Sequence, residues 1–159
     1  MKSKFFTDPN LTFNETKSTL VEEDIVKSIP FDFEGKKDFI LFYTQYNGVV
    51  FPFGAFFYRD SFYEVRRDEY NLLDIGAFFE ISNSENSILK MWESFKADLR
   101  AKDISSKYLP FGNDSSGNLF CIESKTGVVV YIQHENPKNI TNVAPSFLDF
   151  CNKIQEEMR

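Results

Sequence analysis

Residues 108–121, YLPFGNDSSGNLFC, join two apolar runs through a dense group of turn-forming residues. Gly112 and Gly117 can adopt positive φ, and Asn113 and Asp114 can accept hydrogen bonds from nearby backbone amides. The apolar pattern then resumes on the far side of the turn. This arrangement predicts two β-strands joined by a polar turn, which favours a sheet-containing fold.

The rest of the chain shows both helical and strand periodicity. Thr19 with Glu22 and Ser82 with Glu85 have the spacing of a capping box, which predicts a helix start at each place. The pair Asp98 and Lys102 is expected to support the exposed face of the second of these helices. The expected helices cover residues 20–28, 36–46, 88–99 and 145–158, and the expected strands cover 49–58, 61–66, 75–81, 119–123 and 128–133. These elements predict a single α+β domain with a mostly antiparallel central sheet flanked by about four helices.

The composition fits one domain with an aromatic core. The chain has 159 residues, enough for a single core, and contains 19 Phe, 7 Tyr and 1 Trp. Cys121 and Cys151 each lie among apolar neighbours, where we expect buried, reduced thiols. The N-terminus lacks a sustained apolar segment and no run reaches membrane-spanning length, so we expect a cytoplasmic protein that does not bind membranes.

The formal net charge is −6, and most of it lies in the first half of the chain. An acidic chain is a poor binder of nucleic acid, which requires clustered Lys and Arg, so a basic protein partner is favoured. Ordinary solvation of acidic surfaces is the alternative. The acidic groups that could form such a partner-binding surface are Glu22, Glu23, Asp24, Asp32, Glu34, Asp68, Glu69, Asp74 and Glu80.

The sequence offers little for catalysis. Residues 112–118 follow G-x-x-x-x-G but continue with Asn118, so the lysine of a phosphate-binding loop is missing. His134 is the only histidine, which leaves too few ligands for zinc. We therefore expect no catalytic residue, cofactor or metal ion. The remaining alternative is a metal-assisted or acid–base hydrolase that uses His134, Glu135 and Asp114.

Several motifs occur together in one order. They are Ile29-Pro30 followed by an aromatic helix and Asn47-Gly48, then residues 108–121, residues 129–135 ending in His134-Glu135, and residues 144–150. In this order they resemble the SUKH superfamily, which contains fungal cell-wall assembly regulators and many bacterial toxin-immunity proteins. The resemblance implies one SUKH-like domain over residues 1–159, with a core at about 19–158. Its implied scaffold residues are Pro30, Asn47, Gly48, Pro110, Gly112, Asp114, Gly117, Asn118, His134 and Glu135.

The resemblance also implies a function. A non-enzymatic domain that binds and neutralises a cognate toxin, possibly a nuclease with a basic surface, is the expected role. A regulatory or scaffold protein of cell-wall glucan synthesis is the alternative. A monomer or weak dimer is expected in either case.

Overall fold

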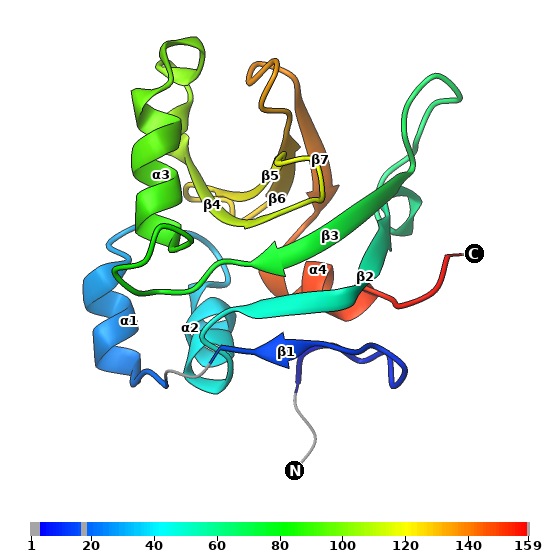
Figure 1. Ribbon diagram of the computed structural model, residues 1–159. Helices are drawn as coiled ribbons and strands as arrows, with labels where there is room; N and C mark the ends of the chain where they lie inside the picture. Colours follow the sequence, from blue (N-terminus) through cyan, green and yellow to red (C-terminus); the bar gives the residue numbers. More distant parts are fainter. Residues whose placement is uncertain (1–3, 17–18, 159) are drawn as a thin grey trace.

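The computed structural model describes residues 4–16 and 19–158, and within them seven strands form one antiparallel sheet in the sequential order β1 to β7 (Figure 1). The strands are β1 (Asn14–Glu15), β2 (Val49–Tyr58), β3 (Leu72–Phe78), β4 (Tyr108–Asn113), β5 (Leu119–Glu123), β6 (Val129–Ile132) and β7 (Ile140–Ala144). The α-helices are α1 (Glu22–Ser28), α2 (Lys36–Gln45), α3 (Ile88–Ala97) and α4 (Phe147–Lys153). Three 3-10 turns complete the elements: η1 (Arg59–Ser61), η2 (Leu99–Ala101) and η3 (Ser105–Lys107). The predicted α+β class is confirmed. None of the described helices has the length and apolarity that a membrane span requires.

The sheet divides into two halves at the junction of β3 and β4. These strands pair only where Ala77 and Phe78 face Asn113 and Gly112, whereas β2 follows β3 along most of its length. The earlier residues of β3, toward Leu72, are not paired with β4, and the later strands curl away from them in Figure 1. One half therefore contains β1 to β3 and the other contains β4 to β7, with an open angle between them.

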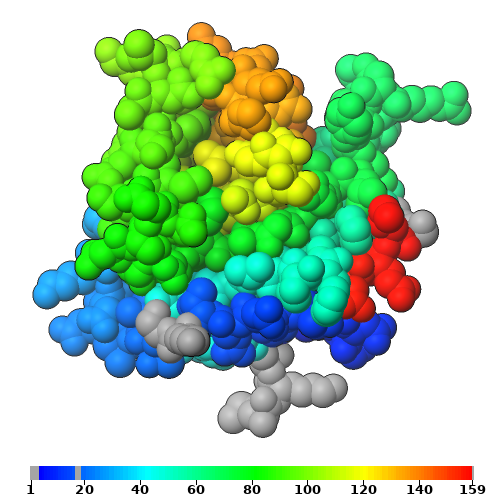
Figure 2. Space-filling view, in the orientation of Figure 1, coloured from blue at the N-terminus to red at the C-terminus, as the bar shows by residue number. Residues whose placement is uncertain are grey.

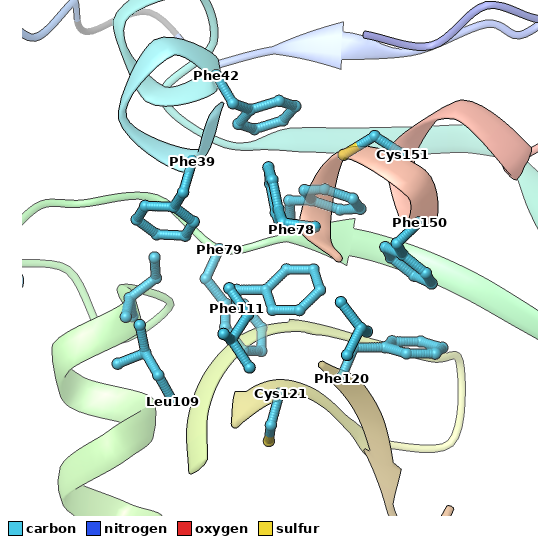
Figure 3. Close-up of a cluster of buried hydrophobic side chains, with 14 of the residues drawn as sticks. Phe39, Phe42, Phe78, Phe79, Leu109, Phe111, Phe120, Cys121, Phe150 and Cys151 are labelled. Carbon is cyan, nitrogen blue, oxygen red and sulfur yellow. The ribbon is translucent and has the colours of Figure 1, made fainter. Parts of the chain in front are cut away.

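The core lies on one face of the sheet, beneath α2 and α4. Figure 3 shows Phe42 from α2 and Phe150 from α4 facing Phe78 of β3 and Phe111 of β4. Phe78 lies 5.3 Å from Phe42 and from Phe111, and 6.0 Å from Phe150, between ring centroids. These rings hold both halves of the sheet against the helices, because each half contributes aromatic side chains to the same cluster.

The predicted hairpin of residues 108–121 is present, but Gly112 has a different role from the expected one. Gly117 has φ +86°, as a turn requires, whereas Gly112 belongs to β4 and does not adopt positive φ. A Cβ at Gly112 would lie 2.8 Å from the carbonyl oxygen of Ala77. Glycine is needed there because β3 and β4 approach closely, so the expectation of positive φ at Gly112 was wrong.

Two helix starts also differ from the predictions. The N-cap of α1 is Val21, which makes no side-chain capping bond, so the capping box from Thr19 to Glu22 is not formed. For α3 the N-cap is Ser87, whose Oγ accepts a hydrogen bond from the backbone N–H of Lys90. The start is shifted from Ser82 because the chain first forms a polar turn beside the end of β3.

Two helices also end earlier than predicted. Helix α3 ends at Ala97, and Asp98 pairs with Arg100 rather than with Lys102. Helix α4 ends at Lys153, because the backbone of Gln155 forms a bridge to β2 instead of continuing the helix. Tertiary pairing thus outweighs the helical spacing of the last residues.

The predicted strand over residues 61–66 is wrong. After β2 the chain enters the short turn η1, in which the N–H groups of Phe62 and Tyr63 donate to the carbonyl oxygen of Arg59. The segment from there to residue 71 projects from the sheet as a loop (Figure 1). The next strand, β3, begins at Leu72, three residues before the expected 75–81 strand.

Both cysteines are buried and free. Burial raises the pKa of the Cys121 thiol and that of the Cys151 thiol well above the ordinary value. Thiols in such surroundings are poor nucleophiles. The prediction of buried, reduced cysteines is confirmed.

Candidate functional site

A cleft with a volume of about 1040 Å³ lies between the two halves of the sheet. One wall is the loop after η1 together with the start of β3, and the other is the turn of residues 114–118 with the ends of β6 and β7. Figure 2 shows the surface hollowed between the segment near residue 65 and the segments near residues 116 and 136. We call this hollow the acidic cleft.

The acidic cleft lies on the sheet face opposite the core. Ile75 of β3 is buried in the core, and the alternate residue Asp74 lines the cleft together with Leu72 and the mostly buried Leu73. On β6, Tyr131 lines the cleft in the same way, between buried neighbours. No described helix lines the cleft, whose walls are strands, loops and the short turn η1.

Negative charge dominates the lining. Among the described residues that line the cleft, the acids are Glu64, Asp68, Glu69, Asp74 and Asp114, and the only base is Arg59. The exposed side chain of Arg66 neutralises part of this charge from outside, through Asp68 at 3.2 Å and Glu69 at 3.1 Å. The cleft therefore carries more carboxylates than basic groups, and no described helix covers it.

Asp114 organises the floor of the cleft. Its Oδ1 accepts hydrogen bonds from the backbone N–H groups of Ser116 and Asn118, and its Oδ2 accepts from the Asn118 amide and, at 2.5 Å, from the Tyr131 hydroxyl. The turn is tied to β3 because the N–H of Ser115 donates to Asp74 Oδ2 at 2.9 Å. These bonds fix the turn, and they connect the two halves of the sheet across the cleft.

Arg59 makes a second connection at the other end of the cleft. Its side chain is buried, and Nη1 donates to Glu69 Oε2 at 3.2 Å and to the carbonyl oxygen of Tyr70 at 2.9 Å. Its Nε donates to the carbonyl oxygen of Asn142 on β7 at 3.5 Å. Arg59 thus holds the projecting loop against the last strand, which fixes the width of the cleft.

The sequence matches one known protein family over most of its length. The model of the SMI1 / KNR4 family (SUKH-1) matches residues 36–153, from the start of α2 to the end of α4. The chain belongs to the SMI1 / KNR4 family. Members are in general non-catalytic immunity or regulatory domains. A search of curated proteins found no match.

Several of the residues that the SUKH resemblance pointed to lie near the junction of β3 and β4. The Asn47 side chain donates to the carbonyl oxygen of Ile81 and accepts from its N–H. A Cβ at Gly48 would lie 2.9 Å from the carbonyl oxygen of Phe78. Pro110 is buried in β4, whereas Pro30 is exposed after α1 and precedes the range matched by the SMI1 / KNR4 family model.

His134 and Glu135 are exposed and contribute to the structure through the backbone. The N–H of His134 donates to Asn118 Oδ1, and the carbonyl oxygens of both residues accept from the Arg100 guanidinium at 2.8 and 3.0 Å. Asp114 is buried and already bonded within its turn. Neither His134 nor Glu135 lines the acidic cleft, and no cluster of metal ligands occurs among the described residues.

The structure separates the predicted acidic groups. Asp68, Glu69 and Asp74 line the acidic cleft, whereas Glu80 accepts hydrogen bonds from two serine hydroxyls near the start of α3. Glu22 and Glu23 line a separate pocket on α1. The remaining predicted acids lie outside the cleft as well: Asp24 on α1, Asp32 in an ion pair with Lys36, and Glu34 bonded to Lys125 through its backbone.

Sequence reasoning singled out Asp114 and Asn118 of the cleft as scaffold residues, but it missed several others. Arg59 and Glu64 carried no pattern that set them apart from ordinary surface residues, and Tyr131 was expected only as part of an apolar strand. Tyr70 is 82% exposed at the loop wall. In the sequence Tyr70 directly follows the charged residues Asp68 and Glu69, and this position is the signal that could have indicated an exposed aromatic side chain.

Removing the Tyr131 hydroxyl is expected to change the alkaline stability of the protein. Burial and then the hydrogen bond to Asp114 raise the pKa of Tyr131, so the folded protein keeps a proton that the unfolded chain loses near pH ~10. This contribution is fully present below that pH and is lost as pH rises through the raised pKa. The free energy of unfolding of Tyr131→Phe, measured in urea, should therefore fall less steeply with increasing pH above ~10 than that of the wild-type protein. Equal slopes for the variant, the wild type and the exposed-tyrosine control Tyr70→Phe would contradict the assignment.

Proposed function

We propose that this protein is a non-enzymatic immunity protein that binds a cognate toxin in the cytoplasm and blocks the toxin's active surface. The observation that supports this role most directly is the acidic cleft on the open face of the sheet, in a member of the SMI1 / KNR4 family. A nuclease toxin needs a basic surface to bind phosphates, and an acidic inhibitor competes for that surface.

Electrostatics supports fast capture of such a toxin. The chain carries a formal net charge of −6, so a basic partner is attracted before contact. Tight binding needs buried anchors as well as charge, and aromatic residues commonly supply them. The exposed ring of Tyr70 at the edge of the cleft is suited to this role.

Co-expression tests the proposal. The toxin encoded beside the gene is produced in a host with and without this protein, and an inactivated toxin is used to isolate the complex by size-exclusion chromatography. We expect cells that produce the toxin to grow only when this protein is also produced. We also expect the inactivated toxin and this protein to elute as a stable complex. Growth arrest despite soluble protein, or recovery only of endogenous cell-wall synthesis proteins from lysate, would favour the regulatory alternative instead.

A further inference from the structure

The acidic cleft has the shape of a receptor for a polypeptide segment rather than for a small molecule. Small-molecule pockets are mostly apolar and enclose their ligand, whereas this cleft is open and polar. Its walls come from separate halves of the sheet, and no described helix lines it. A projecting loop of a partner can enter such an opening without unfolding either protein.

The negative charge of the cleft favours a positively charged occupant. Of the acids that line it, Glu64, Asp74 and Asp114 form no ion pair with any residue in the described part of the chain. When Arg66 is counted beside the lining residues, the formal charge is still −3. Anionic occupants such as nucleic acid or phosphorylated peptides are disfavoured by this potential.

The geometry also places aromatic groups beside these carboxylates. Tyr70 is exposed on the loop wall, Tyr63 lies half-buried on the same wall, and Tyr131 lies at the floor beside Asp114. A guanidinium or ammonium group can be stabilised by the face of an aromatic ring and, at the same time, by a hydrogen bond to a nearby carboxylate. This combination suits arginine or lysine side chains.

From this geometry we infer that the acidic cleft receives a projecting basic loop of the partner toxin, whose Arg or Lys side chains lie between Glu64 and Asp74 and against Tyr70. The inference rests on the proposed role as a toxin-binding protein and names the part of the toxin that is bound. The buried arginine Arg59 forms its ion pair with Glu69 and also donates to two backbone carbonyl oxygens, so in the structure it is not paired with Glu64 or Asp74.

A selection that does not use the toxin tests this inference. A phage-displayed library of short disulfide-closed loops is selected for binding to the full chain, and the selected loops are measured by isothermal titration calorimetry. We expect enrichment of Arg and Lys, and about tenfold or greater loss of affinity in the double variant Glu64→Gln with Asp74→Asn. Asparagine at position 74 keeps an acceptor for the N–H of Ser115, so the turn is retained.

The matched control is the double variant Glu22→Gln with Glu23→Gln on α1. Both double variants remove two negative charges, but only one pair lines the cleft. Equal loss in both variants would show a general charge effect and overturn the inference, as would selection of apolar loops or of loops that bind the cleft variant unchanged. Basic loops that bind the cleft while the toxin fails to bind would refute the immunity role and the toxin as the source of the loop, and would leave only the selectivity of the cleft for basic loops.

Discussion

Replacing Phe78 with alanine is expected to lower the free energy of unfolding by about 3–5 kcal/mol. The side chain is 2% exposed and contacts the rings of Phe42 on α2, Phe111 on β4 and Phe150 on α4. Its removal leaves a cavity at the point where the two halves of the sheet meet, and the neighbouring rings are held by other contacts and cannot fill it. Urea unfolding monitored by circular dichroism measures the change.

Phe53 on β2 provides the matched control. It is the same residue type in the neighbouring strand but is 75% exposed, so Phe53→Ala should change the free energy of unfolding by less than about 0.5 kcal/mol. Similar losses for the two variants would show that the ring cluster does not carry the stability assigned to it.

Replacing Gly127 with alanine is expected to destabilise the protein by roughly 2–5 kcal/mol. Gly127 has φ +75°, and a Cβ would overlap with the carbonyl oxygen of Glu34. The segment around Glu34 is bound to the hairpin through backbone hydrogen bonds with Lys125. The added methyl group must therefore separate the β5–β6 hairpin from the chain that enters α2, which unfolding experiments would detect.

Gly117→Ala separates the two causes of this loss. Gly117 has a similar φ of +86°, but a Cβ there meets no atom within 4 Å. Only the backbone strain remains, and the expected loss is roughly 1–2 kcal/mol. If both alanine variants were equally stable, close approach to Glu34 would not be the reason for glycine at position 127.

The functional expectations depend on the same architecture. Phe78 and Gly127 lie outside the acidic cleft, so their variants test the scaffold, whereas variants of Glu64 and Asp74 test the binding surface. A toxin that binds the wild type but not the cleft variant, with both proteins equally stable, would connect the surface to the proposed immunity role.

The fold class, the hairpin of residues 108–121 and the aromatic core could all be predicted from the amino-acid sequence. These features follow from local chemistry: turn residues such as Asp114 and Gly117 bend the chain, and apolar residues at strand or helix spacing must be buried. The bounds of β2, Val49–Tyr58, agree with the prediction because its aromatic and valine run has no competing helical period.

The ends of the helices and the grouping of the charged side chains depend on contacts between residues that are distant in sequence. Gln155 does not continue the helix because its backbone pairs with Phe56 of β2. Position 112 requires glycine because β3, which is distant in sequence, approaches the backbone closely there. The acidic cleft forms because β3 and β4 pair over a short length and then diverge, which brings Glu64 and Asp74 opposite the Asp114 turn. Such convergence depends on the curl of the sheet and on long-range packing, and neither is encoded in the spacing of nearby residues.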